Sequence, residues 1–297
     1  MPALVIGANL PDVDAACLFW LDGVEHLGFR RGITHGPPAM LLLPLMLAGA
    51  LWGWDRWQAQ RGTRPAARLP VSFKWLYALA FIGCLTHPAL DWLNVYGIRL
   101  LEPFSSRWFY GDTLFIIDVW LWALLGYATW FSLRREKRGG EWQRPARIAI
   151  TVALAYIGVN GAITASYVAR DDDVTGQMVI ASPVPLWFWE REMILGQAGR
   201  YAIVDPAIES QDLALTRPAD DAKFIGVVGD CQVPTVTSAV PWANERSAFL
   251  FWSRAPFAER APDGSVILRD ARFYDPRARD RFSVALPEVR CEELPAS

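Results

Sequence analysis

The sequence predicts a mainly α-helical fold, a polytopic transmembrane helix bundle that carries a small β-rich external domain at its C-terminus. Hydrophobic residues make up 53% of the 297 residues and include 15 Trp, whereas only 20% are charged. The apolar runs lie in the first part of the chain, and the remainder is polar and punctuated by proline. We therefore divide the chain into a transmembrane helical domain, 1–170, and a soluble external domain, 171–297.

Four apolar runs predict membrane-spanning helices, because each is close to the ~20 residues that a bilayer core requires. They cover residues 37–54, 73–95, 109–132 and 147–168. A fifth, weaker candidate at 3–21 is interrupted at residues 7–11, where Pro11 suits the first turn of a new helix. This interruption predicts a broken N-terminal helix, which is tolerated at membrane depth only where it lines a cavity.

Basic residues predict the orientation, because loops rich in Lys and Arg remain cytoplasmic. One such loop follows the 37–54 run and a second follows the 109–132 run. The last span then runs outward and places the C-terminal domain outside. A net charge of −2 with no basic face predicts that nucleic acid is not a partner.

Alternating runs at 200–204 and 265–269, separated by Pro, Gly and Asp, predict that the external domain is built of strands. Cys231 and Cys291 are its only cysteines, and an oxidising periplasm permits a bridge between them. Sequence alone does not show whether their Cα atoms lie close enough to bond.

The three histidines of the chain all fall in its hydrophobic first third, interleaved with acidic residues. His87 and Asp91 are four residues apart inside an apolar run, so on a helix they share one face and can bind one ion. An ionisable group inside a membrane is costly unless it faces a cavity, a partner or a metal. The predicted metal ligands are Asp12, Asp14, His35, His87, Asp91 and Asp118, of which the last four are expected at one depth near the outer face.

Histidine combined with carboxylates predicts a divalent metal cofactor, zinc or manganese. Such an ion lowers the pKa of bound water towards ~7 and polarises an ester. Arg30 and Arg31 can bind a phosphate oxygen, because a guanidinium makes two parallel hydrogen bonds to it. We expect Asp14, His35 and Arg31 to be the catalytic residues.

Each of these residues also has a structural interpretation. His35 can be an ordinary interfacial side chain, and His87 with Asp91 can be an ion pair that joins two helices. Arg30 and Arg31 can be membrane-surface charges, and Asp118 can accept a hydrogen bond from the indole of Trp120 or Trp122. On this alternative the protein is a non-catalytic membrane scaffold or binding protein. A metal transporter has less support, because no inverted repeat is visible.

The motifs around these residues resemble those of a bacterial inner-membrane metal-dependent hydrolase family related to a LexA-binding membrane protein. That family carries Leu-Pro-Asp-x-Asp, then His-Arg-Gly-x-Thr-His-Ser, then a His-x-x-x-Asp helix. The corresponding segments here are 10–14, 29–36 and 87–91. The resemblance continues through 103–105, 110–112 and 117–118 to the tail segments 181–186 and 251–257, and so covers nearly the whole chain.

The resemblance implies a metal-dependent hydrolase of the bacterial inner (plasma) membrane. From the predicted spans, orientation and metal site we expect a multi-pass protein with a periplasmic C-terminal domain, which hydrolyses a phosphoester or other ester, in a small-molecule or lipid substrate, by metal-activated water. Two positions depart from the family motif. Its first histidine is replaced by Phe29 or Arg30, depending on the alignment, and its final serine by Gly36. If the missing histidine is a ligand, one metal is weakened or lost here.

Overall fold

The computed structural model describes residues 2–171, 177–204, 224–274 and 279–294, and its contacts divide into two units. Unit 1 comprises residues 1–110 with 237–252, and unit 2 comprises 111–236 with 253–297. The two units alternate along the chain, so the division of contacts does not follow the change of composition near residue 170. The predicted boundary near residue 170 separates residues inside the membrane from residues outside it, and it stays a prediction.

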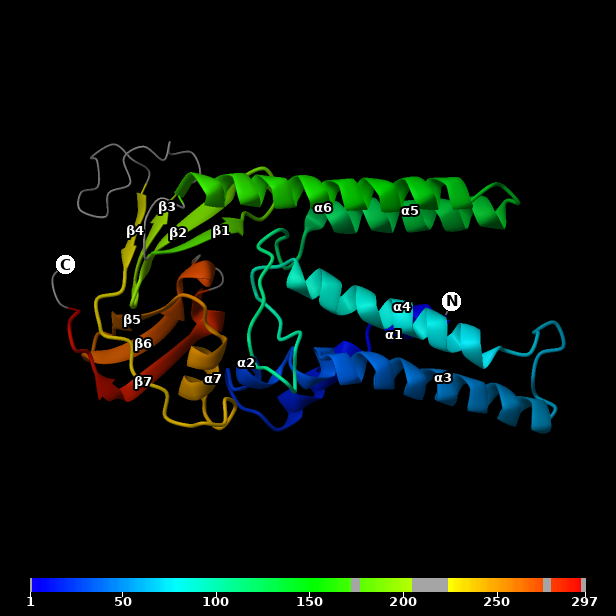
Figure 1. Ribbon diagram of the computed structural model, residues 1–297, viewed down its shortest axis with the longest axis horizontal. Coiled ribbons are helices and arrows are strands. Elements are labelled where there is room, and N and C mark those ends of the chain that lie inside the picture. The colour runs from blue at the N-terminus through cyan, green and yellow to red at the C-terminus, as the bar shows by residue number, and fades with distance from the viewer. Residues whose placement is uncertain (1, 172–176, 205–223, 275–278, 295–297) are drawn as a thin grey trace. The chain divides into compact units, whose positions relative to one another are not determined.

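Unit 1 is helical. Its elements are α1 (Pro2–Gly7), the 3-10 helices η1 (Pro11–Phe19) and η2 (Ile33–His35), α2 (His26–Phe29), α3 (Pro37–Gln60), α4 (Phe73–Trp92) and α7 (Glu245–Trp252). The long helices α3 and α4 lie side by side, as the blue and cyan ribbons of Figure 1 show. The predicted break in the N-terminal helix is present, since α1 ends at Gly7 and η1 begins at Pro11.

Helix α1 packs closely on α4 through two glycines. A Cβ at Gly7 would lie 2.5 Å from the carbonyl oxygen of Ala80, and one at Gly83 would lie 2.3 Å from that of Leu4. Both distances are too short for any side chain, so the two backbones approach directly. This contact brings the break at residues 8–10 beside the C-terminal half of α4.

Unit 2 joins a helical hairpin to two antiparallel sheets. The hairpin is α5 (Val119–Lys137) and α6 (Gln143–Asp171). The first sheet has the order β1 (Met178–Pro183), β2 (Arg191–Gln197), β3 (Arg200–Val204) and β4 (Phe224–Val228). The second has the order β5 (Pro256–Arg260), β6 (Ser265–Asp270) and β7 (Ser283–Arg290). The predicted strands at 200–204 and 265–269 are therefore confirmed.

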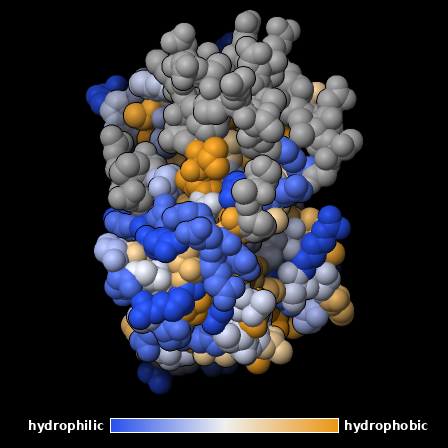
Figure 2. Space-filling view, turned by 90° about the vertical axis from the view of Figure 1, so that its left-hand side faces the viewer, coloured by the Kyte–Doolittle hydropathy of each residue, from blue (hydrophilic) through white to orange (hydrophobic). Residues whose placement is uncertain are grey.

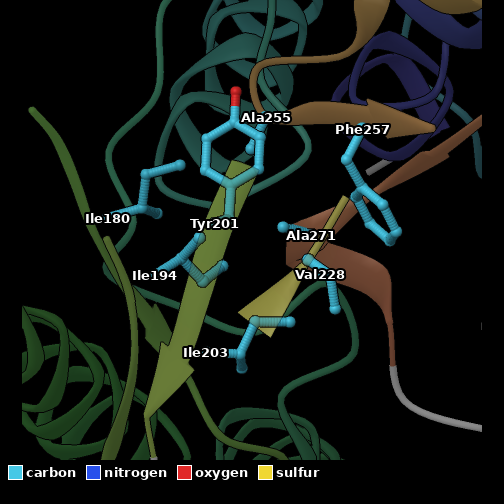
Figure 3. Packing of buried hydrophobic residues seen from close by; sticks show 8 residues of the cluster. All are labelled: Ile180, Ile194, Tyr201, Ile203, Val228, Ala255, Phe257 and Ala271. Atoms are coloured by element: carbon cyan, nitrogen blue, oxygen red, sulfur yellow. The ribbon is translucent and has the colours of Figure 1, made fainter. Parts of the chain in front are cut away.

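The first sheet is buried on both faces, because successive side chains of a strand point to opposite sides. One face carries Ile194 and Ile203, which belong to the same buried cluster as Phe257 of the second sheet (Figure 3). The opposite face carries Met193 and those buried residues of β1, β2 and β3 that point to the same side. Tyr167 and Val168 at the end of α6 pack against this face. The hydrophobic core of unit 2 therefore lies on either side of this sheet.

Cys231 and Cys291 form a disulfide, with their Cα atoms 5.2 Å apart. The bridge ties the segment after β4 to the residue that follows β7. In the view of Figure 2, hydrophilic side chains cover much of the coloured surface. Long stretches of α3 and α6, in contrast, expose apolar side chains such as Met46 and Leu154.

Among the residues that the structure describes, two helices are long and apolar enough to cross a membrane by length and composition. They are Pro37–Gln60 and Gln143–Ala169. The predicted runs 73–95 and 109–132 correspond to α4 and α5, whose passage through a bilayer stays a prediction. The expectation of a helix from residue 109 was wrong, because α5 begins at Val119, where the Asp118 carboxylate accepts a hydrogen bond from the Leu121 amide.

A buried ion pair predicts that unit 2 loses stability in acid. Burial by itself raises the pKa of Asp270, but the charge of Arg272 and hydrogen bonds from Arg272 and Ser253 outweigh it and hold the pKa below its ordinary value. A carboxyl with a lowered pKa stabilises the fold above its unfolded pKa, and this contribution disappears as pH falls through the folded pKa. We expect the protection of β6 amides against hydrogen exchange to be constant down to about pH 5 and to fall below about pH 4.

The Asp270→Asn variant is the control for this prediction. It has less stability at neutral pH and a flatter acid profile, because the titrating carboxyl is gone. An equally steep loss of protection in the variant would show that another group controls acid unfolding.

Candidate metal centre

The candidate centre begins at the helix break of unit 1. Pro11 starts η1, and Asp12 and Asp14 lie in its first turn. The Asp14 side chain is only 2% exposed, whereas that of Asp12 is 43% exposed. The same short helix therefore places the Asp14 carboxylate in the interior and the Asp12 carboxylate partly at the surface.

The segment 30–36 wraps around the Asp14 carboxylate. Asp14 Oδ2 accepts hydrogen bonds from the Arg31 amide at 2.8 Å and from the Thr34 hydroxyl at 3.0 Å. The Arg31 amide faces this oxygen from a left-handed backbone with φ 55°. Asp14 thus fixes the loop that carries His35.

Each histidine has one ring nitrogen held by the protein. His87 Nδ1 lies 2.7 Å from the Ala8 carbonyl oxygen, which only accepts, so Nδ1 carries the hydrogen. His35 Nδ1 lies 2.9 Å from Thr34 Oγ1, whose own hydrogen is donated to Asp14, so this nitrogen also donates. In its neutral form each ring therefore presents Nε2 as a lone pair, the tautomer that a metal-binding histidine needs.

The two Nε2 atoms converge on Asp91 of α4. Asp91 Oδ2 lies 3.5 Å from His35 Nε2 and 3.5 Å from His87 Nε2. Asp12 Oδ2 lies 3.6 Å from His87 Nε2, and ligand atoms of Asp12, His35 and His87 all lie within 4.8 Å of one another. Ligands of one tetrahedral zinc ion at 2.0–2.1 Å are separated by about 3.3 Å, so the pairs at 3.5 and 3.6 Å are close to the spacing of a shared ion.

Two of these atoms are buried without a hydrogen-bond partner, His35 Nε2 and Asp91 Oδ2. Leaving buried polar groups unpaired costs about 1–3 kcal/mol each, and native structures seldom do so without a reason. A lone pair and a carboxylate oxygen that face each other at 3.5 Å repel unless a proton or a metal cation lies between them. The residues present therefore fit a divalent metal ion.

Arg31 positions Asp91. Its guanidinium lies 3.0 Å from Asp91 Oδ1 and also donates to the Asn94 side chain and the Gly97 carbonyl, both at 3.2 Å. It also stacks over the Tyr96 ring at 4.4 Å. These contacts hold Asp91 Oδ1, whereas Oδ2 faces the histidines. Arg31, which we expected to be catalytic, therefore serves to position Asp91.

The structure brings together four of the six predicted ligands, namely Asp12, His35, His87 and Asp91. Asp14 lies behind them, because its Oδ2 is 3.6 Å from Nδ1 of His35, the nitrogen that faces away from the cluster. Its place suits orientation of the ring better than metal coordination or catalysis.

Asp118 is engaged elsewhere, in unit 2. Its carboxylate caps α5 and accepts a hydrogen bond from the Tyr156 hydroxyl at 2.8 Å. The Trp120 indole, which the structural interpretation offered as its partner, instead donates to the Leu186 carbonyl. No contact among the described residues joins Asp118 to the histidines.

Sequence reasoning missed Arg99 as a supporting residue. Its buried guanidinium donates to the carbonyl oxygens of Gly28, Phe29 and Arg30, and to the Glu102 carboxylate. It thereby closes the turn that leads into the 30–36 loop. The available signal was a basic residue in a loop expected to be external, where the positive-inside rule predicts few.

The side chains at positions 29 and 30 diverge. Phe29 packs edge-on against Trp20 and Trp242, with ring centroids 6.2 and 5.4 Å apart. Arg30 faces the two aspartates of η1, with a guanidinium nitrogen 3.0 Å from Asp12 Oδ1. Arg30 is thus the residue beside the centre.

Comparison with known proteins supports the membrane assignment. A search of curated proteins and a search of solved structures found no match. A family model described as "YdjM inner membrane protein" matches residues 1–167, more than half of the chain, and includes every residue of the candidate centre. That description names an inner membrane protein and no reaction or metal, so hydrolysis and metal dependence stay predictions. The chain belongs to the YdjM inner membrane protein family.

Proposed function

We propose that this inner-membrane protein is a metal-dependent hydrolase that cleaves a phosphoester or other ester at the periplasmic side of the membrane. One observation carries the proposal. His35 Nε2, His87 Nε2 and Asp91 Oδ2 face one another, and the first and last of these are buried without a hydrogen bond. The donor set of imidazoles and carboxylates favours zinc or manganese.

Charge supports a cation at this place. Among the described residues, the carboxylates of Asp12, Asp14 and Asp91 form ion pairs with two guanidiniums, those of Arg30 and Arg31. With both histidines neutral, one negative charge remains uncompensated in a part-buried site. In the scaffold alternative, a proton on His87 Nε2 between Asp12 and Asp91 would supply this charge instead, so metal analysis distinguishes the two.

A bound divalent ion supplies an acidified water and polarises the ester. The residues around the metal position orient its ligands. Thr34 and Asp14 fix the tautomer of His35, the Ala8 carbonyl fixes that of His87, and Arg31 holds Asp91. This preorganisation lowers the cost of bringing the ligands together.

Apolar side chains beside the centre favour a substrate with a lipid part. Val13, between the two aspartates, is 54% exposed, and Ile33, two residues before His35, is 60% exposed. Phe19, at the end of η1, is 92% exposed. Exposed apolar groups of this kind in a membrane protein face lipid or an apolar ligand.

The Cys231–Cys291 disulfide supports the external placement of the C-terminal strands. Disulfides persist in oxidising compartments such as the bacterial periplasm and are rare in the cytosol. This agrees with the orientation that the basic loops predict.

Elemental analysis of the detergent-purified protein tests the proposal. We expect zinc or manganese to be retained by the wild type and lost from His87→Ala. His26→Ala is the matched control, because His26 bonds only to the nearby Gly23 carbonyl and lies outside the ligand group. Hydrolysis of chromogenic phosphoesters and short-chain esters should follow the metal content. A wild type that binds neither ion after incubation with both would exclude the hydrolase, and retained metal without hydrolysis would indicate a metal-binding protein.

A further inference from the structure

We infer that the centre holds a single divalent cation, and that the Arg30 guanidinium occupies the position between Asp12 and Asp14 where a second cation would otherwise bind. The inference rests on the proposed function, because it concerns the stoichiometry of the same site. It follows from the contacts of one side chain.

Arg30 lies against both aspartates of η1. Its terminal nitrogen is 3.0 Å from Asp12 Oδ1, and its Nε is 3.6 Å from Asp14 Oδ1. The second oxygen of Asp12 faces His87 instead, at 3.6 Å. Asp12 therefore lies between two positive positions, the guanidinium on one side and the metal position on the other.

The two neighbouring carboxylates of η1 require a positive charge beside them. Asp14 Oδ1 is buried and has no hydrogen-bond partner, and Asp12 is two residues away in the same 3-10 turn. Two carboxylates this close destabilise each other unless a positive charge separates them. Arg30 supplies that charge permanently, because a guanidinium does not lose its proton in proteins.

Charge balance then limits the site to one metal ion. With both histidines neutral, three carboxylates and two guanidiniums leave one negative charge, so one divalent ion would change the total to +1. A second divalent ion would leave an uncompensated excess of positive charge in a part-buried site. It would also compete directly with Arg30 for the Oδ1 atoms of Asp12 and Asp14.

Metal stoichiometry in variants of Arg30 tests the inference. Zn²⁺ is titrated into metal-free protein against a chromophoric chelator, and the bound metal is confirmed by elemental analysis. We expect one ion per chain in the wild type and in Arg30→Lys, which keeps the charge. We expect two in Arg30→His, which removes the permanent charge and adds a ligand.

Arg30→Gln is a second variant, in case the imidazole disturbs folding. It removes the charge without adding an imidazole, and we expect a second, weaker Zn²⁺ ion. With Mn²⁺, the wild type should give the electron paramagnetic resonance spectrum of an isolated ion, whereas Arg30→His should show spin coupling between two ions.

The outcomes separate the two proposals. A wild type that binds no metal overturns the proposed hydrolase itself. Two ions in the wild type overturn the single-ion inference and leave the hydrolase intact. One ion in the wild type and still only one in both folded Arg30→His and Arg30→Gln overturns the role given to Arg30.

Discussion

Asp91→Asn is expected to abolish tight metal binding, whereas Asp14→Asn is expected to weaken it only about 10–100-fold. Asp91 Oδ2 faces the Nε2 atoms of both histidines, so an amide there removes the negative charge from the proposed metal position. Asp14 contacts the opposite nitrogen of His35 and the backbone of Arg31, so its loss disturbs orientation rather than coordination. Chelator competition with Zn²⁺ measures both affinities.

Two further variants separate metal binding from stability. Asp22→Asn changes an exposed aspartate of the same unit and should leave the affinity unchanged. Arg31→Met breaks the ion pair with Asp91 but leaves its carboxylate, so we expect one ion bound with reduced affinity. If Asp14→Asn removed the metal while Asp91→Asn retained it, the two aspartates would have the opposite roles.

Arg191→Met is expected to destabilise unit 2 by about 5 kcal/mol or more, because it leaves several buried acceptors unpaired at about 1–3 kcal/mol each. Arg191 is completely buried, and burial lowers the pKa of its guanidinium to about 10. Its donors are satisfied by protein oxygens alone, those of Thr113, Asn160, Thr164, Phe188 and Glu190. The side chain thus ties β2 to α6 and to the segment before α5.

Chemical denaturation in detergent measures this loss. Arg290→Met is the control, because Arg290 lies on β7 and makes an exposed hydrogen bond to the Asp263 carbonyl. We expect the control to change stability by less than about 0.5 kcal/mol. Similar losses in the two variants would show that the Arg191 network adds little beyond an ordinary surface contact.

The local elements of this protein could be predicted from sequence, because their signals lie within a few turns of chain. Apolar runs predicted α3, α4 and α6, Pro11 predicted the break between α1 and η1, and alternation predicted β3 and β6. The four-residue spacing of His87 and Asp91 correctly put both side chains on one face of α4, since 3.6 residues make a turn. The start of α5 was missed, because a cap depends on one side-chain contact, that of Asp118.

The site required the tertiary structure, because residue type and predicted depth do not show which atom of a side chain faces which partner. Asp12 and Asp14 look equivalent in sequence, yet only Asp12 belongs with the histidines, while Asp14 lies behind His35. Asp118 satisfied the same criteria of type and depth but caps a helix of the other unit.

Long-range contacts likewise decided how the chain divides. Nothing in the local sequence of 237–252 shows that α7 belongs with unit 1, where Glu245 accepts a hydrogen bond from the Val24 amide. The sequence by itself determined the long apolar helices and the strands and predicted metal chemistry, because these follow from local periodicity and side-chain type. Only the fold decided which carboxylates and guanidiniums meet, because such contacts join residues far apart along the chain.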